Sequence, residues 1–97
     1  MDTFTSRMFG RVSIVKLAYG NGCLAVQLVS AADGEEIATL SVNLPAYAHE
    51  LGPNEFFAKT YAENQEISQE ALASGLVCDT GARVDTDIGP VPIWRCR

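Results

Sequence analysis

The chain has 97 residues, of which 47% are hydrophobic and 20% are charged, a composition typical of one globular domain rather than a disordered segment. A fold of this length is expected to expose about 5,400 Å² and to bury about 64% of its unfolded surface, which allows one modest core. Seven basic against twelve acidic residues give a net charge of −5. This charge disfavours direct nucleic-acid binding, because phosphate neutralisation needs a surplus of Lys and Arg.

The sequence also carries no signal for a membrane or for export. No apolar run approaches the roughly eighteen residues of a membrane-spanning helix, and the first residues, MDTFTSRMFG, lack a continuous apolar signal core. The odd number of cysteines fits a reducing compartment with free thiols. We therefore expect a soluble cytoplasmic protein.

The first half of the chain has the pattern of an antiparallel β-meander. Three runs read as strands, namely Val12–Tyr19, Cys23–Ser30 and Glu36–Leu44. The segments between them, Gly20-Asn21-Gly22 and Asp33-Gly34, are typical of tight turns, because Gly and Asn tolerate positive φ. In the third strand, alternation predicts that four apolar residues face inward: Ala38, Leu40, Val42 and Leu44.

The middle of the chain predicts a loop, a short ambiguous segment and one helix. Pro45–Asn54 reads as a loop or a single irregular turn, because Pro lacks the N–H that a strand needs. Glu55–Tyr61 is compatible with a fourth strand or with the lead-in to a helix, and its adjacent Phe residues favour the strand. Asn64 is a suitable N-cap for a helix over Gln65–Ser74, with Gly75 just beyond its end.

The last part of the chain predicts two further strands. Leu76–Asp79 reads as a short strand, Ala82–Gly89 as a polar turn region, and Val91–Cys96 as a final strand that Pro92 places at a sheet edge. The predicted fold is a single α+β domain over residues 1–97. It is an antiparallel sheet of order β-β-β-β-α-β-β that begins with a meander and carries one short helix.

Residue patterns for catalysis are missing from the sequence. The single histidine, His49, lies in the loop after Pro45 with no nucleophile motif, and the cysteines have no metal-ligand spacing. Arg95 and Arg97 flank Cys96 and would lower its thiol pKa, a feature insufficient by itself for a catalytic role. The other two cysteines lie in apolar runs and are expected to be core residues. We expect no enzyme activity, cofactor or metal.

Acidic residues concentrate in the second third of the chain. Residues 33–70 hold eight acids and one base, whereas residues 1–32 carry a net positive charge and residues 71–97 are neutral. Glu63, Glu66 and Glu70 would lie along one helix face, over about 10 Å, if the helix extends to Glu63. Such a row can imitate phosphates and attract a basic groove, although ordinary surface acids also maintain solubility. The predicted partner-binding residues are Asp33, Glu35, Glu36, Glu55, Glu63, Glu66 and Glu70.

Aromatic residues are a second candidate for partner contacts. Phe56, Phe57 and Tyr61 cannot all face inward on one strand, and Trp94 lies near the end of the sequence. Most aromatics are core residues, and one left exposed beside the acids would be a candidate interface anchor.

From Leu24 to Pro92 the chain resembles a family of small acidic proteins, uncharacterised in function, of bacterial chromosomes, phages, plasmids and conjugative elements. The resemblance rests on the order of five segments: LAVQLV, EIATLSVNLP, NEFFAKTYAENQ, ASGLV and TG. The setting of that family implies roles such as counter-defence against the host. In size and charge the chain is also similar to small acidic phage proteins that inhibit CRISPR complexes, many by occupying a basic nucleic-acid channel.

These observations predict a non-enzymatic inhibitor of anti-CRISPR type, encoded by a phage or mobile element. Its acidic face would bind a basic protein surface, such as that of a CRISPR effector complex, in the host cytoplasm without direct nucleic-acid contact. The alternative is an accessory mobile-element protein that binds a partner through an exposed sheet edge.

Overall fold

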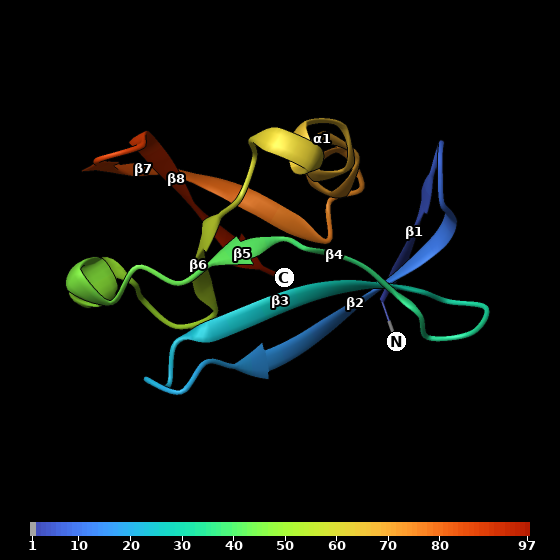
Figure 1. The fold of residues 1–97 in the computed structure, drawn as a ribbon, viewed down its shortest axis with the longest axis horizontal. Coiled ribbons are helices and arrows are strands. Elements are labelled where there is room, and N and C mark those ends of the chain that lie inside the picture. The colour runs from blue at the N-terminus through green and yellow to red at the C-terminus, as the bar shows by residue number, and fades with distance from the viewer. Residues whose placement is uncertain (1) are drawn as a thin grey trace.

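The computed structural model describes residues 2–97 and has an α+β fold, as the sequence predicts (Figure 1). The first antiparallel sheet has the order β1-β2-β3-β4 and consists of Thr3–Ser6, Gly10–Ala18, Leu24–Ser30 and Glu36–Thr39. The second has the order β5-β6-β8-β7, in which β5 to β8 are Ser41–Val42, Glu55–Ala58, Val77–Thr86 and Gly89–Cys96. The helical elements are η1 (Pro45–Glu50), η2 (Ala62–Asn64) and α1 (Gln65–Ala73). The exposed surface of 5427 Å² agrees with the size expected from chain length.

A single residue, Leu40, joins the two sheets. Its backbone N–H donates to Val26 of the first sheet at 2.8 Å, and its carbonyl accepts from Lys59 beside the second sheet at 2.7 Å. The predicted third strand is therefore split into β4 and β5, which belong to different sheets. The Leu40 side chain is fully buried between them, so the crossing of the chain coincides with the centre of the core.

The adjacent residues Phe56 and Phe57 supply two separate apolar clusters. Successive side chains of a strand point to opposite faces of its sheet. Phe56 packs in the main core between the two sheets and α1, in an edge-to-face contact with Trp94 whose ring centroids lie 6.4 Å apart. Phe57 packs on the other face of the second sheet, where Tyr47 and Leu51 from the η1 region help to cover it. Both Phe side chains are thus buried, and the strand interpretation of this segment is confirmed.

Helix α1 packs across the open side between the two sheets, in contact with β1 and β7 (Figure 1). Its buried residues are Ile67, Ser68 and Ala71. The helix ends as predicted, since Gly75 has a φ of 81° and donates to the carbonyl of Leu72.

Asn64 holds the start of α1 against the first sheet. Its side chain is 1% exposed, and its amide donates to the Thr39 carbonyl at 2.7 Å and to the Lys59 carbonyl at 3.1 Å. Asn64 therefore precedes the helix as predicted, but its side chain bonds β4 and the segment after β6, whereas the sequence suggested a bond to the first turn of the helix.

Several predicted boundaries are wrong. Six strands, not the predicted four, precede α1, because β1 comes before the first predicted strand and the predicted third strand is divided at Leu40. The predicted turn region Ala82–Gly89 largely belongs to β7, which bulges between Asp79 and Arg83 and then continues. Strand β8 lies between β6 and β7, not at an edge. Pro92 is tolerated because the β6 pairing already ends at Ile93.

Candidate protein-binding face

Two large apolar side chains project from the turn between β1 and β2. Met8 is 72% exposed and Phe9 is 45% exposed, although hairpin turns usually carry small or polar residues. Gly10 closes this three-residue turn with a φ of 71°, a conformation that favours glycine. We call Met8 and Phe9 the apolar tip.

Three glutamates from the α1 region lie on one side of the apolar tip. Glu63, Glu66 and Glu70 line a hollow of about 90 Å³ together with Ile67 and both residues of the tip. They share one side of the molecule as the sequence predicts, but Glu63 belongs to η2. Regular helix cannot extend through Ala62, whose φ of 54° is left-handed.

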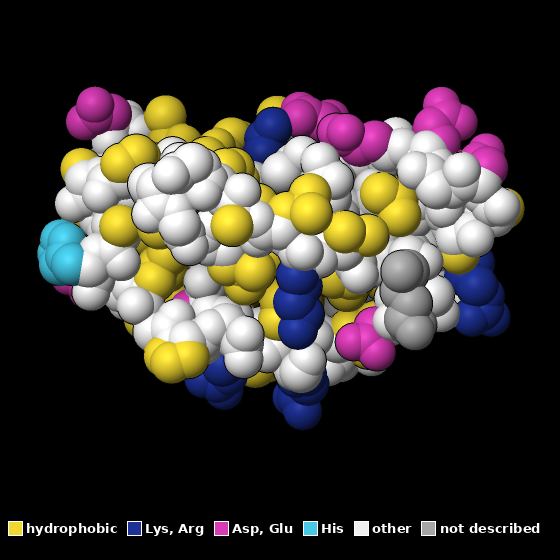
Figure 2. All heavy atoms as spheres, turned by 90° about the horizontal axis from the view of Figure 1, so that it is seen from below, with side chains coloured by type: hydrophobic (Ala, Val, Ile, Leu, Met, Phe, Trp, Pro, Cys, Tyr) yellow, Lys and Arg dark blue, Asp and Glu magenta, His cyan; other side chains and the backbone are white. Residues whose placement is uncertain are grey.

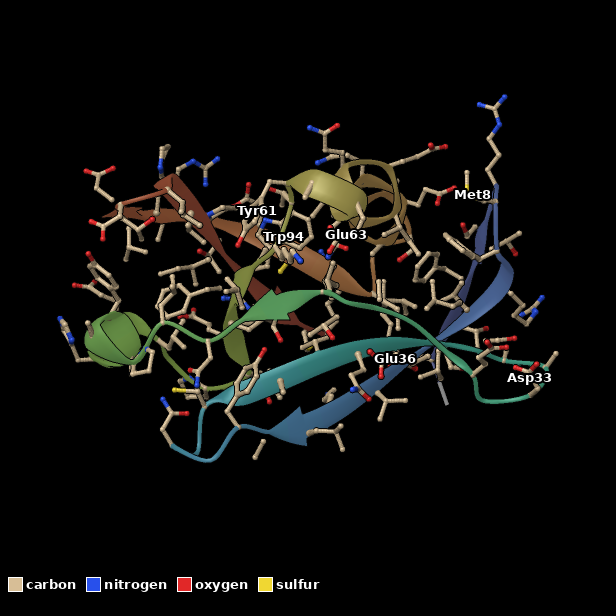
Figure 3. The ribbon with its side chains drawn as sticks, viewed as in Figure 1. Met8, Asp33, Glu36, Tyr61, Glu63 and Trp94 are labelled. Atoms are coloured by element: carbon tan, nitrogen blue, oxygen red, sulfur yellow. The ribbon has the colours of Figure 1, made fainter. Side chains whose placement is uncertain are left out.

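Three acids, two from the turn between β3 and β4 and one from the start of β4, lie on the other side of Phe9. Asp33, Glu35 and Glu36 line a second hollow, of about 250 Å³, together with Phe9 and Ile37. Figure 3 shows Asp33 on this turn, Glu36 at the start of β4, Met8 at the hairpin and Glu63 at the start of the helical segment. Phe9 lines both hollows, so the two acidic groups flank a common apolar centre. We call their six carboxylates the acidic rim: Asp33, Glu35, Glu36, Glu63, Glu66 and Glu70.

The acidic and basic side chains are unevenly placed on the surface. Viewed from below, most of the visible acids lie along the upper edge, from one end of the molecule to the other, and most of the visible Lys and Arg side chains lie lower (Figure 2). One base, Arg7, precedes the apolar tip in the hairpin turn. A second base, Lys59, pairs with Glu63, so two cations border the acidic rim.

Glu55, the seventh predicted contact, lies outside this face. It begins β6, where its carboxylate accepts from the Gly52 N–H at 2.7 Å and lies 3.8 Å from the Arg95 guanidinium. Its role is to hold the loop before β6, and its charge is offset by Arg95. We therefore exclude it from the acidic rim.

Two rim carboxylates are engaged within the fold. Glu70 accepts from the Ser6 hydroxyl at 2.8 Å and from the Arg7 N–H at 2.7 Å, which fastens the β1–β2 hairpin to α1. Glu63 accepts from the Lys59 ammonium, and this hydrogen bond is the main cause that lowers the pKa of Glu63 and raises that of Lys59. Both glutamates shape the face more than they offer unpaired charge.

The remaining rim carboxylates are oriented to solvent. Asp33 accepts from the Glu35 N–H at 3.0 Å and so stabilises its own turn. Within residues 2–97, the carboxylates of Glu35, Glu36 and Glu66 make no hydrogen bond or salt bridge. All three side chains are exposed. They are the rim charges most available to a basic partner.

Of the aromatic residues that the sequence offers as interface anchors, Tyr61 is the exposed one. It is 36% exposed, and the Lys59 ammonium lies 5.7 Å from the centre of its ring. The apolar tip lies in the first ten residues, where the sequence predicts no strand, so it is not among the predicted contacts. The signal that identifies it is Met8-Phe9-Gly10, a large apolar pair before a turn glycine.

The cysteines differ from the sequence-based expectation. Cys23 and Cys78 are half-buried, whereas Cys96 is buried. Burial is the main cause that raises the pKa of the Cys96 thiol, which reverses the expected effect of its neighbours. Arg95 and Arg97 are exposed because alternate residues of a strand face opposite ways.

We expect Cys96 to react with a thiol reagent at least about tenfold more slowly than the other two cysteines at about pH 8. Peptide mapping by mass spectrometry after timed alkylation measures each rate. Because burial raises the pKa of the Cys96 thiol in the folded state, its contribution to the free energy of unfolding is fully present below the unfolded pKa of about 8.5. That contribution is lost as the pH rises through the folded pKa. Equal rates at all three cysteines would contradict the burial of Cys96.

Comparisons with known proteins gave no match to a protein-family model, to a curated protein or to a solved structure. The resemblance to small acidic proteins of mobile elements therefore stays a prediction.

The described residues contain neither a recognisable metal site nor a membrane-spanning helix. Within residues 2–97, no group of three or more His, Cys, Asp or Glu side chains is placed to hold a metal ion. In the same part of the chain, no helix is both long and apolar enough to cross a membrane. His49 is exposed beside Glu50 on η1, as expected for a solvated residue.

Proposed function

We propose that this protein is a non-enzymatic inhibitor of anti-CRISPR type, encoded by a phage or mobile element and active in the cytoplasm of the bacterial host. Its acidic rim binds a basic, nucleic-acid-binding surface of a host defence complex. The observation that carries this proposal is the grouping of six carboxylates, from two distant parts of the sequence, around the apolar tip. Clustered negative charge both steers and orients a basic partner.

The geometry suits competition with a nucleic acid for a protein surface. The two acidic groups lie on separate elements, one on η2 and α1 and the other on the β3–β4 turn and the start of β4, so the carboxylates present an area rather than a single point. A basic groove that binds phosphates along a backbone would contact such an area at several places. The three solvent-oriented carboxylates, Glu35, Glu36 and Glu66, would make those contacts.

The test uses reconstituted CRISPR effector complexes of several types and measures their binding to target DNA by gel shift. We expect the wild-type chain to block DNA binding by at least one complex. The triple variant Glu35→Lys, Glu36→Lys, Glu66→Lys should need at least about tenfold more protein for the same effect, since each close charge pair contributes about 1 kcal/mol even in water. These residues are chosen because their carboxylates make no contact in residues 2–97 that folding would lose.

A matched control separates location from total charge. The variant Glu50→Lys, Asp85→Lys, Asp87→Lys changes the net charge equally, but these residues belong to η1 and the β7–β8 hairpin, at the other end of the long axis (Figure 1). It should inhibit like the wild type. The proposal would be contradicted if the wild-type chain leaves DNA binding by every complex unchanged, or if the two triple variants lose inhibition equally.

A second candidate function is supported by a free sheet edge on β2. Strand β1 pairs with Gly10–Ser13 only, and no strand within residues 2–97 pairs with the outer side of Val15–Ala18. The Ile14 N–H points to the β1 side of the strand and donates to the Asp2 carbonyl. Residues two apart in a strand direct their backbone N–H and C=O groups to the same side, so those of Lys16 and Ala18 point to the open edge. A partner strand could add there.

Proline at Lys16 distinguishes this alternative. Lys16→Pro removes an N–H that faces away from β3, so the sheet should tolerate it while an added strand loses a hydrogen bond. If the partner binds at the acidic rim, Lys16→Pro should bind like the wild type. Loss of binding in Lys16→Pro, with an unchanged circular dichroism spectrum, would favour the edge.

A further inference from the structure

The apolar tip is exposed but firmly positioned. Ser6 and Arg7, which lead into the turn, donate to the two carboxylate oxygens of Glu70 at 2.8 and 2.7 Å, and the Phe9 N–H donates to the Ser6 hydroxyl at 3.3 Å. These bonds tie the turn to α1 and to itself. A turn backbone held in place before binding loses little conformational entropy on association, which favours a role in recognition.

Exposure of Met8 and Phe9 needs an explanation that folding does not give. Two other hairpin turns carry Gly20-Asn21-Gly22 and Asp33-Gly34, residues that water solvates readily, whereas the β7–β8 turn carries one exposed apolar residue, Ile88. Large apolar side chains at a turn gain nothing while they remain in water, and their burial against a partner is favourable. Contiguous exposed apolar side chains with a polar border are typical of interaction sites.

We infer that Met8 and Phe9 are the apolar anchor of the binding face and that they take a basic amphipathic segment of the partner protein. In such a segment a large apolar side chain covers the tip, and Lys or Arg residues on either side reach the two halves of the acidic rim. This inference rests on the proposed function for the choice of face and adds the chemistry of the occupant. Charge complementarity favours a basic amphipathic segment as the occupant, because acidic side chains lie on both sides of Phe9.

The test uses two synthetic peptides of equal positive charge, one with leucines and lysines in an amphipathic helical pattern and one with serines in place of the leucines. Fluorescence anisotropy measures their binding at about 50 mM and about 300 mM NaCl. We expect the wild-type chain to bind the leucine peptide at least about tenfold more tightly than the serine peptide. Met8→Ser with Phe9→Ser should abolish that preference and retain the weak, salt-sensitive binding of both peptides.

Ile88 provides a matched control. It is 63% exposed at the β7–β8 turn and is preceded by Asp85 and Asp87, so it too is an apolar turn residue near acids. Ile88→Ser should keep the preference for the leucine peptide. If the double variant fails to fold, the single variant Met8→Ser replaces it and should weaken the preference for the leucine peptide. Met8 is the more exposed residue of the pair, so its replacement should disturb folding least.

The inference is overturned if the wild-type chain binds both peptides equally or binds neither, or if Ile88→Ser loses as much preference as the variant of the tip. Its failure is distinguishable from failure of the proposed function. Preference for the leucine peptide without inhibition of any CRISPR complex would contradict the proposed target alone. Inhibition of a complex without that preference would contradict the anchor alone.

Discussion

Replacement of Trp94 by Ala is expected to lower the free energy of unfolding by about 4 kcal/mol, the largest effect we predict for any single substitution. Trp94 is 2% exposed and is among the largest side chains of the main core, where Phe56 meets it edge-to-face. Its loss would leave a cavity between the sheets and remove an aromatic contact of about 0.5–1.5 kcal/mol.

The companion substitution Trp94→Phe should cost much less, about 1–2 kcal/mol. Within residues 2–97 the buried indole Nε1 has no hydrogen-bond acceptor, so phenylalanine removes an unsatisfied donor while it keeps a ring against Phe56. Urea unfolding followed by circular dichroism measures both variants. Equal losses from Trp94→Phe and Trp94→Ala would mean that the indole nitrogen has a stabilising partner.

Replacement of Asn64 by Ala should lower the free energy of unfolding by about 3 kcal/mol. The Asn64 amide donates to two carbonyls, those of Thr39 and Lys59, and the substitution leaves both without this donor in a buried place. Unfolding in urea, followed by the fluorescence of the single tryptophan, gives the loss. Asn64→Leu, which keeps the branched shape and the number of side-chain heavy atoms, should be nearly as damaging, because it also loses the two donated hydrogen bonds.

This substitution also bears on the binding face. Asn64 joins the start of α1 to β4, and these elements carry the two halves of the acidic rim. Hydrogen exchange in α1 should therefore accelerate in Asn64→Ala. The control Gln65→Ala alters the exposed next residue and should change the free energy of unfolding by less than about 0.5 kcal/mol. A loss below about 1 kcal/mol in Asn64→Ala would contradict this role.

Local patterns predicted the meander, the short helix and the end of that helix at Gly75. These features depend on neighbouring residues, through alternation, turn chemistry and capping. The split at Leu40 was not predictable in this way, because nothing in Glu36–Leu44 says which strand each half will pair with. The continuation of β7 was hidden by its polar residues, Asp79 to Arg83, which lie in a bulge.

The candidate site was predictable in part. Charge counting along the chain found all six rim residues, but it also selected Glu55, whose pairing with Arg95 and Gly52 depends on tertiary structure. It could not distinguish Glu70, which fastens the hairpin, from Glu66, which faces solvent. The apolar tip lay outside the acidic segment of the sequence, and only the fold brings it between the two acidic groups.

The most direct test of the binding face is a map of backbone amide shifts by NMR when the leucine–lysine peptide is added to the wild-type chain. If the acidic rim and apolar tip form one surface, the perturbed amides should cluster in residues 7–10, 33–37 and 63–70. Perturbation centred on residues 15–18 of β2, or on the β7–β8 turn, would contradict a common face and assign the contact to another part of the molecule.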